Sequence, residues 1–124
     1  MTVFAIQNPM TMDGGGRLTP KFKDVEARSS KYGELVWLLS PSANPLSDVD
    51  SLVEELHDKL ENYTGSDYII LIGNPILIAA AVTIAAFWND GCVNLLQWSN
   101  GGYIPVFLNL HEVHALRSND NEVI

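Results

Sequence analysis

Asparagine followed by proline occurs three times in the sequence, each time shortly after an apolar run: Asn8-Pro9, Asn44-Pro45 and Asn74-Pro75. If the apolar runs are parallel strands, the three pairs lie at one edge of the sheet, where open α/β sheets bind ligands. Asn74 also stands where a helix begins, and free amides and the helix dipole favour an anion there. The pattern predicts a small-molecule or nucleotide pocket made by Asn8, Ser40, Ser42, Asn44, Gly73 and Asn74.

The same residues also have a local explanation. An asparagine side chain at the start of a helix accepts a hydrogen bond from the first turn, and a following proline ends the preceding strand. Two interpretations therefore stay open: a ligand pocket, or three strand ends whose asparagines cap the next element.

Other residues that could do chemistry form weak patterns. His111-Glu112-x-His114 has the ligand types of a metal site, but two histidines three apart near a chain end are poor evidence for one. No serine has a nucleophile setting such as G-x-S-x-G, and Cys92 opens an apolar run, as a small core residue would. Gly14-Gly15-Gly16 leads into Arg17-Leu18-Thr19-Pro20 and lacks the helix, lysine and hydroxyl of a phosphate loop. We therefore expect no catalytic residue, metal or cofactor, and the sequence favours a non-enzymatic protein.

The uncharged stretch between Asp67 and Asp90 organises the predicted fold. Tyr68 to Ile72 suits a buried strand, Gly73 and Asn74 form a turn, and a helix starts at Pro75, the preferred proline position. The stretch is long enough for a membrane span of about 20 residues, but Gly-Asn-Pro interrupts it and both flanks are acidic. The sequence therefore favours a soluble domain.

The remaining runs complete a single α/β domain over residues 1–111, followed by a polar tail over 112–124. The prediction is a largely parallel sheet with two βαβ crossovers and a C-terminal antiparallel edge hairpin. Pro105 places the last strand at the edge because it cannot donate to a ladder. The three glycines predict a mobile or hairpin-like tip. The predicted elements are strands 2–7, 34–40, 92–98 and 103–110 and a helix that begins at Ser47.

The helix that begins at Pro75 is apolar on every side, whereas the helix over 47–60 has an acidic face. A helix that is apolar all round must be covered on all sides. One side meets the sheet, and the other needs either the 10–31 loop or a second copy of the chain. We predict a homodimer.

The chain has 124 residues and a net charge of −8, with five of its seven basic side chains before residue 32. Residues 32–124 carry two basic and twelve acidic side chains, which disfavours nucleic acid as a partner. The basic stretch could instead meet an acidic protein partner. A single cysteine excludes an intrachain disulfide, and the N-terminus lacks the features of a signal peptide, so we expect a cytoplasmic protein.

Three runs carry a resemblance: Y-G-E-L-V-W-L-L-S-P-S-A-N-P, D-Y-I-I-L-I-G-N-P-I-L-I-A-A-A-V-T-I-A-A and L-L-Q-W-S-N-G-G-Y-I-P-V-F-L-N-L. With them, residues 1–110 resemble small uncharacterised proteins of tailed-phage genomes, while the polar tail departs from the likeness. The resemblance implies expression inside a bacterial host and assigns no activity to any residue. Together with the composition, it predicts an accessory protein that acts through protein contacts.

Overall fold

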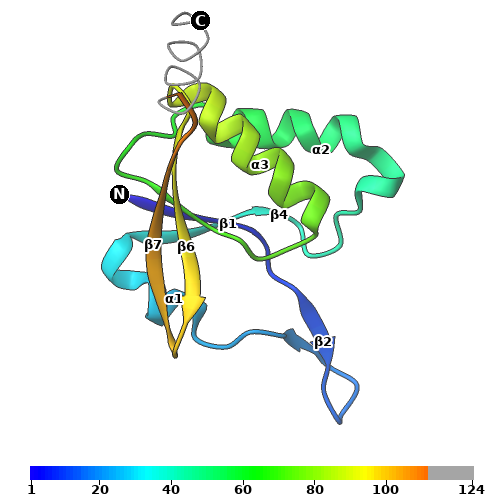
Figure 1. Ribbon diagram of the computed structural model, residues 1–124. Coiled ribbons are helices and arrows are strands. Elements are labelled where there is room, and N and C mark those ends of the chain that lie inside the picture. The colour runs from blue at the N-terminus through cyan, green and yellow to red at the C-terminus, as the bar shows by residue number, and fades with distance from the viewer. Residues whose placement is uncertain (112–124) are drawn as a thin grey trace, which may run out of the picture.

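Five strands form the main sheet of the computed structural model, which describes residues 1–111 (Figure 1). The sheet order is β4-β1-β5-β6-β7. All neighbours are parallel except β6 and β7, which pair antiparallel at the edge. The predicted α/β fold class is therefore confirmed, including the C-terminal edge hairpin. The strands are β1 (Thr2–Gln7), β4 (Glu34–Leu39), β5 (Tyr68–Ile70), β6 (Cys92–Ser99) and β7 (Gly102–Asn109).

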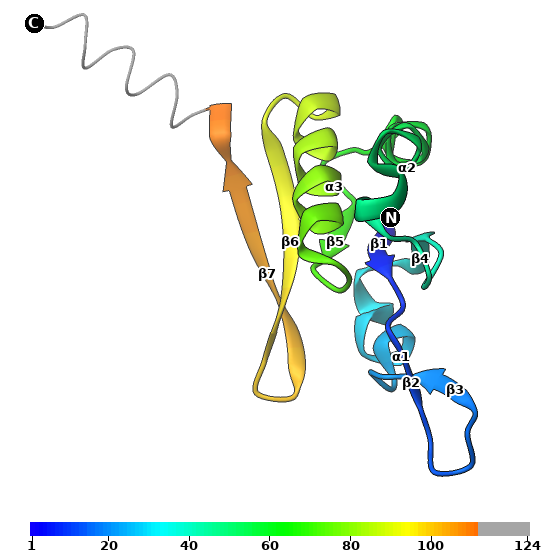
Figure 2. The same ribbon diagram turned by 90° about the vertical axis from the view of Figure 1, so that its right-hand side faces the viewer.

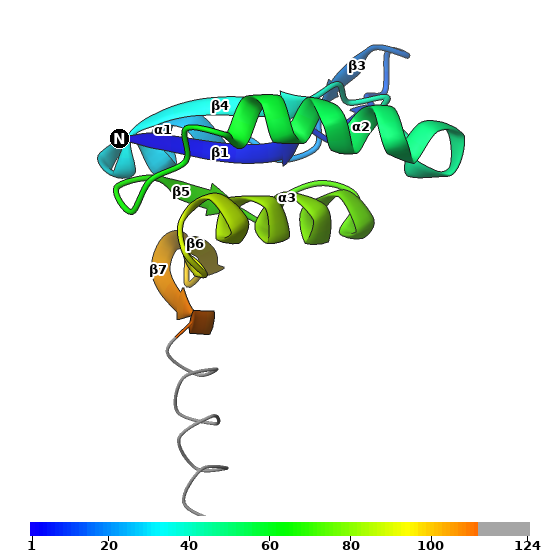
Figure 3. The same ribbon diagram turned by 90° about the horizontal axis from the view of Figure 1, so that it is seen from above.

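Helices cover both faces of the sheet. The long helices α2 (Pro45–Leu60) and α3 (Pro75–Trp88) pack against each other over one face (Figures 2 and 3). The other face carries the short α1 (Val25–Ser29) and a 3-10 turn, η1 (Ser30–Tyr32). Side chains that alternate along β1 fill both layers, because successive residues of a strand point to opposite faces.

The order of the strands creates a switch point between β1 and β5. After β1 the chain moves to β4, on one side, whereas after β5 it moves to β6, on the other side. The first crossover, β4-α2-β5, passes over β1, and the second, β5-α3-β6, joins neighbours. The carboxyl ends of β1 and β5 are therefore the place where an open α/β sheet leaves a crevice.

Asparagine caps both long helices. The side chain of Asn44 accepts a hydrogen bond from the amide of Leu46 at 3.0 Å, and that of Asn74 accepts one from Ile76 at 2.9 Å. In each case proline occupies the first helical position, where its missing N–H costs nothing. The cap at Asn74 confirms the start that the sequence predicts for α3.

The predicted start of α2 at Ser47 is wrong, because the helix begins two residues earlier, at Pro45. The backbone then leaves helical geometry at Asp48 (φ −159°, ψ 72°) and resumes after it. The Asp48 carboxylate accepts from the amide of Ser51 at 3.2 Å, as a cap would. Two caps in series thus start this helix.

Both predicted turns are hairpins. The triple glycine joins β2 (Met10–Met12) to β3 (Leu18–Pro20), which form a separate two-stranded sheet that projects from the body (Figure 1). Asn100 and Gly101 adopt the positive φ that the β6–β7 turn needs. The sequence analysis did not predict α1, whose five residues are too short for a periodic signal.

The polar tail predicted for 112–124 lies outside the residues that the structure describes. Within residues 1–111, none of the helices is both long and apolar enough to cross a bilayer.

Strand β5 ends at Ile70, two residues earlier than predicted, and Gly73 follows in a conformation that favours glycine. Its φ is 140°, and a Cβ atom there would lie 3.1 Å from the Gln7 nitrogen and 3.1 Å from Cγ2 of Ile6. The turn between β5 and α3 therefore runs so close to β1 that a Cβ atom would force its neighbours to shift by a few tenths of an ångström.

We predict that Gly73→Ala lowers the free energy of unfolding by about 2 to 4 kcal/mol, because it adds backbone strain and a clash with β1. The matched control is Gly14→Ala, since a Cβ atom at Gly14 would meet nothing within 4 Å. Urea unfolding measures both variants. Equal midpoints for the two would contradict the close approach of this turn to β1.

Candidate functional site

The buried side chain of Gln7 joins the carboxyl ends of three strands. Its amide nitrogen donates to the carbonyl oxygens of Ser40, at 3.1 Å, and Ala43, at 2.8 Å. Its amide oxygen accepts from the backbone amide of Asn74 at 2.9 Å. The last residue of β1 thus holds the segments that follow β4 and β5, and it satisfies three backbone groups with one side chain.

A cavity of about 780 Å³ lies at these strand ends, on the face of the sheet that carries α1. Its volume is in the range of small-molecule sites, ~300–1,000 Å³. Ile70, Ile72 and Leu96 give it an apolar floor, and the segment from Lys21 to Val25 borders it. It occupies the position that the switch point predicts for a ligand.

Aromatic side chains form part of the wall. Phe22 and Trp98 line the cavity and are each about half exposed, at 47% and 51%. Trp98 packs edge-on against Tyr103, with ring centres 5.1 Å apart, and the Arg28 guanidinium lies 5.3 Å from its ring centre. The Trp98 ring is therefore held in place while half of its surface stays open to a ligand.

The cavity has charged side chains of the opposite sign to the net charge of the protein. Lys21 and Lys23 line it, and no carboxylate does, although the chain has a net charge of −8. Lys21 lies 5.7 Å from the centre of the Phe22 ring. Burial raises the pKa of Tyr103, and the nearby Arg28 partly opposes this, so the phenol stays neutral at physiological pH.

The structure places only some of the six predicted pocket residues at the cavity. Gly73 and Asn74 line the cavity, whereas Asn8, Ser40, Ser42 and Asn44 do not. The hydroxyls of Ser40 and Ser42 bond each other at 2.9 Å, and the two helix-capping asparagines use their side-chain oxygens within the chain. Ligand contact by this set stays a prediction, and the free amides expected at the start of α3 are partly taken up by its own cap.

Several cavity residues were not singled out by the sequence analysis. Gln7 carried a usable signal, since a polar residue that ends an apolar strand must find buried partners. Lys21 and Lys23 belong to the basic stretch, for which the sequence suggested an acidic protein partner and not this cavity. Phe22 carried no signal, because the path of this segment depends on contacts with the distant strands.

A second surface lies on the opposite face of the sheet, beside α3. Val93 and Leu95 of β6 pack in the core beneath α2 and α3, and their register partners on β7 point the same way. Neither α3 nor the stretch Cys92–Asn109 contains a charged residue or a histidine. We call this surface the neutral face, formed by the exposed side chains of Ile76, Thr83, Phe87, Ile104 and Val106.

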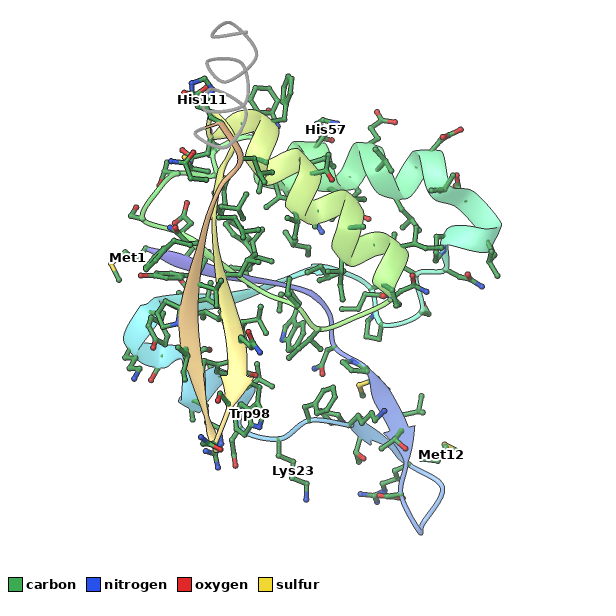
Figure 4. All side chains as sticks on the ribbon, in the orientation of Figure 1. Met1, Met12, Lys23, His57, Trp98 and His111 are labelled. Atoms are coloured by element: carbon green, nitrogen blue, oxygen red, sulfur yellow. The ribbon has the colours of Figure 1, made fainter. Side chains whose placement is uncertain are left out.

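Within residues 1–111, the histidines and the cysteine lie away from the cavity. Figure 4 shows Trp98 and Lys23 at one end of the molecule and His57 and His111 at the other. His57 packs edge-on against the rings of Phe87 and Trp88, with ring centres 6.4 Å apart in both pairs. Among residues 1–111, no three histidine, cysteine, aspartate or glutamate side chains group closely enough to hold a metal ion. The other two residues of the His111-Glu112-x-His114 pattern lie outside the described part of the chain.

We predict that Gln7→Met, which keeps the length of the side chain, lowers the free energy of unfolding by about 2 to 3 kcal/mol, because three backbone groups lose their partner. The control is Gln97→Met, a change on an exposed side chain of β6 that should cost less than about 0.5 kcal/mol. Urea unfolding of both variants decides the matter. If Gln7→Met unfolds at the midpoint of the control, the three hydrogen bonds contribute nothing to stability.

Comparison with known proteins gives one match. The family model described as Phage Pam3 gp32-like protein matches residues 1–110, nearly the whole chain. No curated protein and no solved structure shows a significant similarity. The match agrees with the resemblance that the sequence suggests.

Proposed function

We propose that the chain, which belongs to the Phage Pam3 gp32-like protein family, is a phage accessory protein that acts through protein contacts as a homodimer and catalyses no reaction. The observation that carries this proposal is the neutral face. The partner that best fits such a face is a second copy of the same chain.

The exposure of the neutral face supports the proposal. Phe87 is 71% exposed, Ile76 54% and Ile104 50%, which are large values for apolar side chains on neighbouring elements. Large apolar side chains that are exposed to this extent mark contact sites where they gather in one patch. The 10–31 segment does not cover α3, because its helix α1 packs on the opposite side of the sheet and its hairpin projects from the body.

Charge selects the face through which two copies can meet. Each copy has a net charge of −8, so two copies repel each other at most orientations. The uncharged elements α3, β6 and β7 offer an approach without like charges in contact, apart from Asp90 between them. A homodimer across this face buries apolar surface at the smallest electrostatic cost.

Pro105 disfavours one way in which two copies could associate, the pairing of their edge strands. It lies in the middle of the edge strand β7, and it removes a donor from the free edge. Pairing of two β7 edges into a continuous sheet is therefore disfavoured. The copies pack through side chains of the neutral face, and the symmetry axis passes near α3.

We predict that the wild-type chain has the mass of a dimer in light scattering at about 50 µM, and that Thr83→Glu has the mass of a monomer. Thr83 lies exposed on the outer side of α3, and its hydroxyl bonds only the carbonyl of Ala79 in the same helix. The substitution adds like charges at the centre of the interface without a change in the core.

The matched control is Leu46→Glu, which adds the same charge on α2 at a side chain that is 88% exposed. This variant should remain a dimer. A monomeric wild type, or a loss of the dimer in both variants alike, would contradict the proposal.

A further inference from the structure

The cavity at the switch point has no role in the proposed dimer, because it opens on the other face of the sheet. We propose that it binds a free mononucleotide, with the base between Phe22 and Trp98 and the phosphate at Lys21 and Lys23. The site depends on side chains of the Lys21–Val25 segment and of β6, and only marginally on the asparagine-proline pairs.

The side chains that form the walls and floor of the cavity favour a ligand with a planar ring. Two half-exposed aromatic side chains border a cavity whose floor is Ile70, Ile72 and Leu96. A flat heteroaromatic ring gains stacking on such side chains, and every base offers a π-face.

The two lysines that line the cavity, Lys21 and Lys23, favour a ligand with an anionic group. They flank Phe22 in the sequence, so cations and a stacking ring come from one short segment. The single ion pair among residues 1–111 joins Lys59 to Glu55, which leaves both cavity lysines without a carboxylate partner in the described chain. A phosphate monoester carries about two negative charges near neutral pH, which two lysines can balance.

The size of the ligand follows from the volume and from the charge of the body. A cavity of about 780 Å³ holds a mononucleotide with its water. A longer nucleic acid would extend over residues 32–124, which carry twelve acidic and two basic side chains and repel a polyanion. The same charge that disfavours nucleic acid therefore leaves this one cavity suited to its monomers.

Isothermal titration of the full chain with AMP, GMP, CMP and UMP tests the assignment. At least one of them should bind with saturation, and both a nucleoside alone and inorganic phosphate alone should bind at least about tenfold more weakly. Short oligothymidylate should bind no more tightly than the best mononucleotide. Failure of all four to bind at about 1 mM, or tighter binding of the oligonucleotide, would overturn the proposal.

Matched variants identify the residues. Lys21→Gln/Lys23→Gln should weaken binding at least about tenfold, and Arg17→Gln/Lys31→Gln, which removes the same charge outside the cavity, less than about twofold. Lys31 is a close control because it lies over the neighbouring Tyr32 ring at 5.1 Å, as Lys21 lies over Phe22.

Phe22→Leu should weaken binding by a comparable factor, and Phe107→Leu, on an exposed ring outside the cavity, should not. Thermal unfolding confirms that each variant folds. Equal losses in the two charge pairs would show a general charge effect and overturn the site. The dimer plays no part in this readout, so the monomeric Thr83→Glu variant should bind the nucleotide as the wild type does.

Discussion

The hydrogen bonds of one buried amide hold together the end of the sheet where the cavity lies. Gln7 ends β1 and binds backbone groups of the segments that follow β4 and β5. Both segments lead to helices on the same face of the sheet, and without a common partner their polar backbone groups would lie unpaired beside apolar strands. The close approach of Gly73 to β1 is part of the same arrangement. The shape of the cavity follows from it.

Local signals predicted the elements well. Asn74-Pro75 fixed the start of α3, since a cap and a preset φ act within one turn, and Asn100-Gly101 fixed the hairpin because its backbone needs a positive φ. The start of α2 was misjudged because Ser47 and Asn44 both suit a cap, and only the proline after Asn44 separates them. The order of the strands and most of the residues that line the cavity could not be predicted from the sequence. They depend on which strands become neighbours and on the path of the Lys21–Val25 segment, which no short-range pattern encodes.

The distribution of charge divides the surface into regions with different physical properties. Acidic side chains lie along α2 and at the ends of the sheet, the neutral face beside α3 has none, and the cavity has two lysines and no acid. In the proposed dimer, like charges would keep copies of the chain apart except at the neutral face. In the proposed nucleotide site, they would keep polyanions away and admit a small anion, so that one net charge would favour both contacts, on opposite faces of the sheet.

Native-state hydrogen exchange at the backbone amide of Asn74 tests the central role of Gln7 most directly, because this amide donates to the Gln7 side chain at 2.9 Å. The account predicts that it opens with a free energy close to that of the core amides of β1, since its release requires the strand ends to separate. Exchange as fast as that of the exposed Gly15 amide in the hairpin tip would show that Gln7 does not hold these segments, and would contradict the account.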